Sequence, residues 1–223
     1  MKTKVKFILA GAFALLFACL IILVLFVDVG AICPEDRRIG LSGINKAFHD
    51  LTGVNMIWYK ITEALGFLAV GVCALFALIG CIQFIKRKSL LKVDREIFAL
   101  AGLYIFVIGL YILFETVIVN YRPIIMPGDT NVEASFPSSH TMLIITVMGS
   151  AFLTLGKYVE NRTARIFLQA VCIILTVLTV VGRLICGVHW LTDIIGGVLI
   201  SACLISLFSA VTDRICVNDK EKE

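Results

Sequence analysis

Charged residues and histidine are scarce in this chain. Of its 223 residues, 16% are charged and three are histidine, whereas 60% are hydrophobic and the mean hydropathy is +1.00. No soluble globular domain of this size tolerates such a composition on its surface, so the sequence predicts an integral membrane protein. The small net charge of +4 gives no reason to expect a nucleic-acid partner.

Internal repeats, low-complexity tracts and linkers are not evident either. Three lysines precede the first apolar run, but that run of about 20 residues is longer than a signal-peptide core, and no small-x-small cleavage site follows it. We therefore expect an uncleaved first span and a single membrane-embedded domain over residues 1–223.

Six apolar stretches each come close to the roughly 20 residues that a bilayer-spanning helix needs. They cover residues 7–27, 63–84, 97–119, 141–155, 166–185 and 192–211, of which the fourth is the shortest. The predicted fold class is all-α: a polytopic membrane protein with six transmembrane helices in one bundle.

Between the first two stretches, Leu41, Ile44, Phe48 and Leu51 recur at helical spacing with polar residues between them. This pattern predicts an amphipathic helix lying in the membrane interface. The helix is either a packed connector, the interpretation we favour, or a lid over a substrate. His49 within it is expected to meet solvent or lipid headgroups.

Lysine and arginine gather in four segments, namely the N-terminus, residues 86–95, residues 157–165 and the C-terminal tail, which together hold 14 of the 20. The positive-inside rule assigns these segments to the cytoplasm. Both termini are therefore expected to be cytoplasmic, in a plasma-membrane protein whose other connections face outward.

Five of the eight cysteines fall inside the apolar stretches, where they behave as small apolar residues. A sixth, Cys216, lies in the predicted cytoplasmic tail. Only Cys33 and Cys186 are expected near an oxidising face, and the sequence leaves open whether they form a disulfide.

Three polar clusters stand at the ends of the apolar stretches, all on the predicted extracytoplasmic side: Arg122-Pro123, then Pro137-Ser138-Ser139-His140, then Arg183 with His189 and Asp193. Ionisable side chains are costly near a bilayer, so their concentration at one place indicates chemistry there. Three of the four prolines fall between residues 121 and 140. They hold this loop to a defined path, which can position a ligand-binding arginine.

The second cluster has the pattern of a helix start. A serine just before an apolar helix is a strong N-cap signal, and the free backbone N–H groups of such a terminus bind phosphate. The alternative is a simple cap with His140 at the membrane interface.

The third cluster has the pattern of an activated histidine. A spacing of four places His189 and Asp193 on one face of the opening turn of the sixth span. The carboxylate can then hold the imidazole Nδ1–H and leave Nε2 as an oriented nucleophile. Gly187 lets the chain turn so that Arg183, whose guanidinium can grip phosphate oxygens, returns toward His189. A metal site is the alternative, but no dense spacing of His, Cys and Glu supports one.

Each of these residues alone also has a structural interpretation. Arg183 can be a snorkelling interface residue, Asp193 an N-terminal helix charge, and Arg122 an anchor for the third span. Their common position on one side of the membrane favours a shared site.

Taken together, the three clusters resemble the tripartite signature of the type 2 phosphatidic acid phosphatase superfamily, over Glu115 to Asp193. The resemblance implies that His189 attacks phosphorus to form a phosphohistidine, that Asp193 orients it, and that His140 protonates the leaving oxygen. It further implies a set of phosphoryl-binding residues, namely Arg122, Ser138, Ser139 and Arg183. Similar enzymes need no metal or other cofactor, and none is expected here.

The chain departs from the family pattern at three positions. Glu115 stands where the family has lysine, Gly182 where it has serine, and Ser139 where it has glycine. Seven residues make nearly two helical turns, so Glu115 is expected to face the same way as Arg122, about 10 Å deeper. A carboxylate cannot grip phosphate, so we expect it to pair with or orient an arginine and to bear on substrate class more than on mechanism.

The function predicted is that of a membrane lipid phosphatase acting at the outer face, where the lipid tail stays in the bilayer. For a bacterial source, undecaprenyl diphosphate is the leading substrate, with phosphatidic acid or phosphatidylglycerophosphate as the alternative. A non-catalytic lipid-binding or scaffolding protein is a third hypothesis. A six-span transporter is a fourth, but it calls for ionisable residues near mid-membrane, and the spans offer little beyond Glu115. The sequence specifies no oligomeric state.

Overall fold

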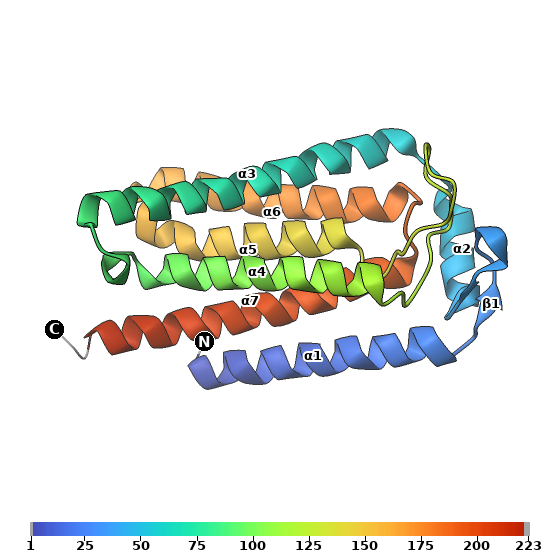
Figure 1. Cartoon of the computed structure of the whole chain (residues 1–223), viewed down its shortest axis with the longest axis horizontal. Coiled ribbons are helices and arrows are strands. Elements are labelled where there is room, and N and C mark those ends of the chain that lie inside the picture. The colour runs from blue at the N-terminus through green and yellow to red at the C-terminus, as the bar shows by residue number, and fades with distance from the viewer. Residues whose placement is uncertain (1, 221–223) are drawn as a thin grey trace.

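Six long helices run side by side along the bundle in a computed structural model that describes residues 2–220, with side chains up to Ile215 (Figure 1). They are α1 (Thr3–Phe26), α3 (Met56–Arg87), α4 (Arg95–Thr116), α5 (Ser139–Tyr158), α6 (Arg162–Ile185) and α7 (Leu191–Lys220). All six are long and apolar enough to cross a membrane. The predicted all-α bundle of six spans is therefore confirmed. Lys222 and the side chains of Cys216 and Lys220 lie outside the described part.

A shorter helix, α2 (Ser42–Thr52), lies across one end of the bundle, which we call the α2 end (Figure 1). It confirms the helix expected between the first two spans. The smaller elements that remain are β1 (Gly30–Ala31) and β2 (Arg38–Ile39), which pair antiparallel, and the 3-10 turns η1 (Pro34–Asp36) and η2 (Leu90–Lys92).

The side of α2 that packs on the bundle is polar at its centre. Asn45 is fully buried, whereas Leu51 is 83% exposed and Ile44 is 55% exposed. Part of the apolar stripe therefore points away from the protein, as expected of a helix that borders a membrane interface.

Several span boundaries differ from the predicted ones by three residues or more, most of all at the start of α3 and at the end of α7, which continues to Lys220 rather than to residue 211. α3 begins at Met56 rather than at residue 63, because the Asn55 side chain caps it by accepting the backbone N–H groups of Ile57 and Trp58. α4 ends at Thr116 rather than at residue 119. Hydropathy alone cannot locate the start of α3, because it carries no information on the Asn55 cap. It also misses the end of α4, because it counts apolar residues after Thr116 that are no longer helical.

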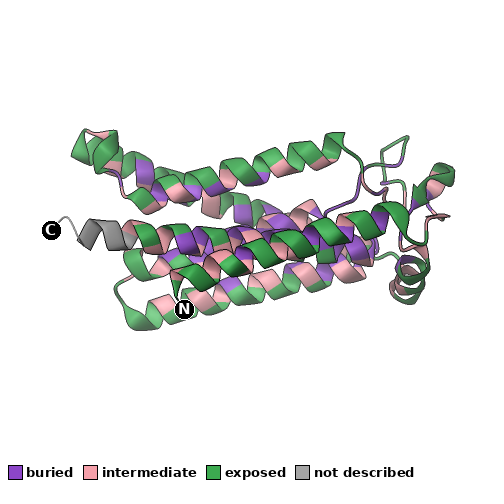
Figure 2. Ribbon diagram, turned by 90° about the horizontal axis from the view of Figure 1, so that it is seen from below, coloured by how far each residue is buried: buried purple, intermediate pink, exposed green. Residues whose placement is uncertain are grey.

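α5 runs through the middle of the bundle and packs against α3, α6 and α7. Half of the residues in its apolar window are buried, which is the largest share among the six spans. Figure 2 shows the buried residues gathered toward the interior of the bundle. A central helix can carry hydroxyl groups that other helices satisfy: Ser150 hydrogen-bonds Tyr104 of α4 at 3.1 Å. This position explains why the fourth stretch is the least apolar of the six.

Ion pairs join the helices at the opposite end, where α1 begins and α7 finishes. Lys6 pairs with Asp213 at 2.7 Å. Asp94, just before α4, accepts hydrogen bonds from Gln83 at 2.9 Å, Arg87 at 2.8 Å and Tyr158 at 3.2 Å. Burial raises the pKa of Asp94, but these bonds and the charge of Lys157 outweigh it and hold the pKa below its ordinary value. One carboxylate thus ties α3, α4 and α5 together.

The seven cysteines with described side chains are all free thiols. Cys33 packs with Ile39 and Trp190, whereas Cys186 packs with Met126 and Val188 in a separate cluster. The two cysteines nearest the α2 end therefore form no disulfide in this structure. Burial raises the pKa of the Cys33 thiol to about 12, which keeps it protonated and unreactive at neutral pH.

Candidate active site

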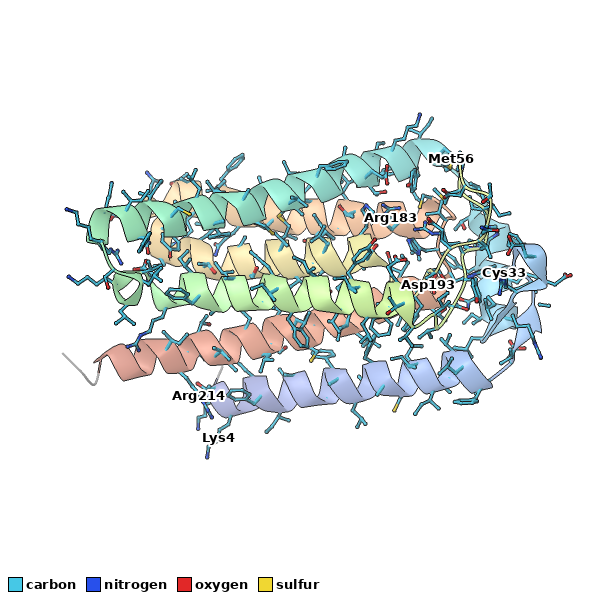
Figure 3. The ribbon with its side chains drawn as sticks, in the orientation of Figure 1. Lys4, Cys33, Met56, Arg183, Asp193 and Arg214 are labelled. Atoms are coloured by element: carbon cyan, nitrogen blue, oxygen red, sulfur yellow. The ribbon has the colours of Figure 1, made fainter. Side chains whose placement is uncertain are left out.

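The three polar clusters meet at the α2 end, where α4 and α6 finish and α5 and α7 begin (Figure 3). Arg183 and Asp193 lie at this end on α6 and α7, whereas Lys4 and Arg214 mark the opposite end. Residues more than 60 positions apart in the sequence are thus brought to one place by the alternating direction of the helices.

Ser138 is the N-cap of α5, as its sequence pattern predicts. Its hydroxyl accepts the backbone N–H of Thr141 at 3.4 Å and the Thr141 hydroxyl at 3.0 Å. Its own backbone N–H donates to the carbonyl of Asp193 at 3.0 Å. The start of α5 is therefore fastened to the start of α7, and the positive end of the α5 dipole faces the same region as His189.

His189 lies in the turn before α7, which begins at Leu191, so the expectation that it occupies the first helical turn is wrong. Asp193 does lie in that turn and is fully buried. One of its oxygens, Oδ2, accepts the Trp190 N–H at 2.9 Å and lies 3.6 Å from His189 Nδ1, while Oδ1 accepts the Asn120 amide at 3.3 Å. The carboxylate thus faces Nδ1 just beyond hydrogen-bond range, which leaves Nε2 for a substrate.

The His189 ring is buried, with its side chain 2% exposed, and neither ring nitrogen has a hydrogen-bond partner among residues 2–220. Burial, together with the charges of Arg122 and Arg183, holds the pKa of His189 well below its ordinary value. A neutral imidazole keeps the lone pair that a nucleophile needs.

Arg183 stands in the last turn of α6 and is 1% exposed. Its guanidinium carbon lies 5.0 Å from the centroid of the Tyr59 ring, a cation–π contact. Within the described part of the chain, its Nε and Nη2 have no hydrogen-bond acceptor. A buried guanidinium with free donors is suited to bind an anion.

Gly182 departs from the family's serine for a reason of packing. A Cβ added at this position would lie 2.6 Å from Thr62 Cγ2 and 3.1 Å from the Trp58 ring. Since α3 approaches α6 this closely, a larger residue at position 182 would force the two helices apart.

Arg122 follows α4 in a connection that folds back on itself, with Tyr121 bridged to Ala134. The Arg122 backbone N–H donates to the Glu133 carbonyl at 3.0 Å, and its Nε lies 3.2 Å from a Glu133 carboxylate oxygen. Its Nη1 is buried and has no hydrogen-bond partner in the part of the chain that the structure describes. Arg122 therefore keeps a free donor, although part of its charge is offset by Glu133.

His140 lies in the first turn of α5 and packs against α3. A Cβ added at Gly66 would come within 2.9 Å of its ring. The ring is within electrostatic range of Arg183, His189 and Arg122. The two histidines and two arginines predicted for a shared site are thus close to one another.

A cavity at the α2 end brings Glu115 together with the polar clusters. Besides apolar side chains, it is lined by Glu115, Arg122, Ser135, Ser139 and His189. The prediction that Glu115 lies two helical turns below Arg122 is wrong, because α4 ends at Thr116 and Arg122 is not helical. The expected ion pair of Glu115 with an arginine is not formed among the described residues, since Glu133 takes that place on Arg122.

Sequence reasoning missed four residues of the site: Tyr59, Asn120, Glu133 and Asn45, which is described below. Tyr59, Asn120 and Asn45 each reach a partner across a long stretch of chain. Glu133 contacts Arg122 within the same connection, and none of the four lies in a recognisable motif. Only Asn120 could have been suspected from the sequence, because it lies two residues before Arg122. Among the described residues, no group of three or more His, Cys, Asp or Glu side chains is placed to hold a metal ion.

Residues 66–215 match the model of the PAP2 superfamily. Among solved structures, the fold is similar to that of a transmembrane PAP2-type phosphatidylglycerolphosphate phosphatase from Bacillus subtilis. That match has a TM-score of 0.65 and 18% sequence identity, and it covers 92% of this chain and 96% of that one. Aquifex aeolicus LpxE is also similar, with a TM-score of 0.40 and 25% identity over 73% of this chain and 93% of that one. No curated protein sequence matches the chain.

Six helices of membrane-spanning length, with two histidines and two arginines gathered at one end, define an integral membrane protein with a polar site at one end of its bundle. The matched residues 66–215 make up more than half of the 223 residues and contain all three polar clusters. The chain belongs to the PAP2 superfamily.

Proposed function

We propose that this protein hydrolyses a lipid phosphate or diphosphate through a phosphohistidine formed on His189. The observation that carries the proposal is the setting of this side chain. Its imidazole is buried and neutral, it faces the Asp193 carboxylate through Nδ1, and it is flanked by two arginines with free donors. Such a site attracts an anion and presents it to a nucleophile.

In the first step, Nε2 of His189 bonds to phosphorus as the bond from phosphorus to the lipid oxygen breaks. The Asp193 carboxylate stabilises the imidazolium character that develops on His189. The anionic substrate favours the protonated form of His140, which gives its proton to the departing oxygen.

In the second step, water attacks phosphorus, its proton passes to His140, and the bond from phosphorus to Nε2 breaks to release inorganic phosphate. The guanidinium groups of Arg122 and Arg183 hold the phosphoryl oxygens, assisted by Ser138, Ser139 and the backbone N–H groups at the start of α5. None of these steps assigned to the chain's own residues requires a bound metal ion.

The lipid tail remains in the bilayer in this proposal. An apolar groove of about 280 Å³ lies between α4 and α5, lined by Val107, Ile108, Tyr111 and Leu143, and it ends beside Ser139 and His140. A tail in this groove would place its phosphate at the polar clusters. The positive-inside distribution of Lys and Arg supports an α2 end outside the cytoplasm and both termini inside it.

Undecaprenyl diphosphate is the first substrate to test where the membrane contains it, because two phosphates offer oxygens to both arginines. A lipid monophosphate, such as phosphatidylglycerophosphate or phosphatidic acid, is the second candidate. It is favoured by the carboxylates of Glu115 and Glu133, which lower the positive charge around Arg122 and so disfavour the more highly charged diphosphate.

The proposal is tested by measuring phosphate release from these three lipids by detergent-purified protein in excess chelator. His189→Ala is compared with Asn131→Ala, an exposed residue of the connection between α4 and α5. We expect chelator-resistant release that is lost only in His189→Ala. Release from none of the lipids would shift the account toward the non-catalytic alternative, and release retained by His189→Ala would remove His189 as the nucleophile.

A further inference from the structure

The turn that carries His189 is covered by a segment that lies outside the matched residues 66–215. Asn55 donates its backbone N–H to the Cys186 carbonyl at 3.0 Å. Gly187, with φ +70°, lies so close to the Gly53 carbonyl that an added Cβ would clash with it. α2 and the residues that follow it thus form a tight cover over the turn.

α2 itself reaches the turn through two side chains. His49 Nε2 lies 3.2 Å from the Gly187 carbonyl oxygen, and the His49 ring packs 5.4 Å from the Trp190 ring, centroid to centroid. Asn45, one helical turn earlier, is fully buried beside Thr192. His49 is half-buried, so the expectation that it meets solvent or headgroups holds for part of the ring only, while the rest of the ring contacts the turn.

Asn45 satisfies its side chain within the protein. Its Nδ2 donates to the Thr192 hydroxyl at 3.0 Å and to the Gly40 carbonyl at 3.1 Å, and its Oδ1 accepts the Thr192 backbone N–H at 3.2 Å. Asn45 and Thr192 are 147 positions apart in the chain. Two of these three bonds end on the second residue of α7.

The hydrogen bonds of Asn45 replace the N-cap side-chain acceptor that α7 lacks. The first backbone N–H groups of a helix have no partner within it, and the N-cap side chain normally accepts one from the second or third residue. The residue before α7 is Trp190, which has no side-chain acceptor. Asn45, which lies on α2, accepts the Thr192 backbone N–H in place of an N-cap side chain. Asp193 accepts the Trp190 N–H, as the third residue of a helix does in a capping box.

We propose that Asn45 is a positioning residue for the phosphatase reaction: it caps α7 from a different helix and thereby fixes Asp193 against His189. This inference rests on the proposed function for its effect on turnover. It makes α2 a rigid support of the nucleophile, in agreement with a packed connector and in place of a moving lid.

The test compares Asn45→Ala with Asn45→Asp, which keeps an oxygen to accept the Thr192 N–H, and with Lys46→Ala, an exposed neighbour on α2, as the matched control. We expect Asn45→Ala to lower kcat about tenfold or more with KM changed little, since small misplacements of a nucleophile cost that much. Asn45→Asp should recover most of kcat, and Lys46→Ala should match wild type. Unchanged kcat in Asn45→Ala, or a rise in KM alone, would overturn the proposal.

Hydrogen–deuterium exchange gives a readout that does not depend on activity. Asn45→Ala should raise exchange at the start of α7 and leave the middle of α5 protected as in wild type; unchanged exchange there would contradict the cap. If wild type releases no phosphate but the exchange result holds, the proposed function fails and the cap stands.

A second variant applies if Asn45→Ala does not fold. Thr192→Val removes only the hydroxyl contact and so loses one of the two bonds between Asn45 and Thr192; it should lower kcat about threefold. A wild-type kcat in Thr192→Val would overturn the proposal.

Discussion

Buried ionisable side chains carry most of the chemistry assigned to this protein, and their charge states follow from their neighbours. Burial disfavours the charged imidazole of His189, and Arg122 and Arg183 disfavour it further, so its pKa lies well below the ordinary value. The two cations that we propose to bind phosphate thus also favour the neutral form of the proposed nucleophile.

A pH profile follows from this lowered pKa. A base with a lowered pKa remains neutral to more acidic pH, so the acid limb of kcat/KM that belongs to His189 should lie below about 6.5, the ordinary histidine value. Arg122→Gln removes one cation and should move that limb to higher pH. The measurement is kcat/KM against pH, with the ionisation of the lipid phosphate determined separately by ³¹P NMR. An enzyme limb at or above the ordinary value would contradict the account.

Glu115 offers a second prediction at the same scale. Because it lines the cavity beside Arg122 and has no ion-pair partner in the described residues, Glu115→Lys should add a phosphate-binding cation without breaking a contact. We expect KM to fall severalfold, and more for a diphosphate than for a monophosphate. Steady-state kinetics check this, with Glu115→Gln as the neutral control. Loss of folded protein in both variants would mean that Glu115 has a structural partner.

At the scale of elements, the sequence predicted the six spans and the Ser138 cap, because hydropathy and N-capping are local signals. It could not predict that α4 stops at Thr116 or that the connection after it folds back to place Glu133 on Arg122. The sequence also gave no indication that Asn45 hydrogen-bonds Thr192. Such contacts depend on which distant segments the bundle brings together, and no pattern in one chain encodes that pairing.

The carboxylate of Asp94 provides a stability prediction for the helices it joins. Asp94→Asn should lower the thermal unfolding midpoint in detergent, because hydrogen bonds to a charged group contribute about 1.5–3 kcal/mol each in favourable settings. The partial exposure of this site reduces that contribution. The pKa of Asp94 is lowered in the folded state, so its contribution is present above the unfolded value near 4 and is lost as pH falls below it. The difference between wild type and variant should therefore shrink in acid. A difference that grows in acid would contradict this assignment.

At the scale of the whole molecule, the two ends of the bundle differ in kind. One end holds the buried His189 and Arg183 beneath α2, and the other holds surface ion pairs and the ends of α1 and α7. This polarity suits an enzyme that meets substrate on one side of the membrane only. The single domain over residues 1–223 and the sidedness stay predictions.

Sidedness can be measured in intact cells with a membrane-impermeant maleimide. Thr130→Cys, exposed at the α2 end, should react at once, whereas Glu160→Cys, exposed between α5 and α6, should react only after permeabilisation. Wild type, with its own cysteines, supplies the background. The reverse pattern would place the active site in the cytoplasm.

The central claim is a covalent bond between phosphorus and His189, and trapping it is the most direct measurement. Protein mixed with a ³²P-labelled lipid phosphate and quenched within milliseconds should carry label that is stable in alkali and labile in acid, as a phosphohistidine is. The label should be absent from His189→Ala and present in Asn131→Ala. Label that persists in His189→Ala, or rapid wild-type turnover with no labelled protein at any time, would contradict the account.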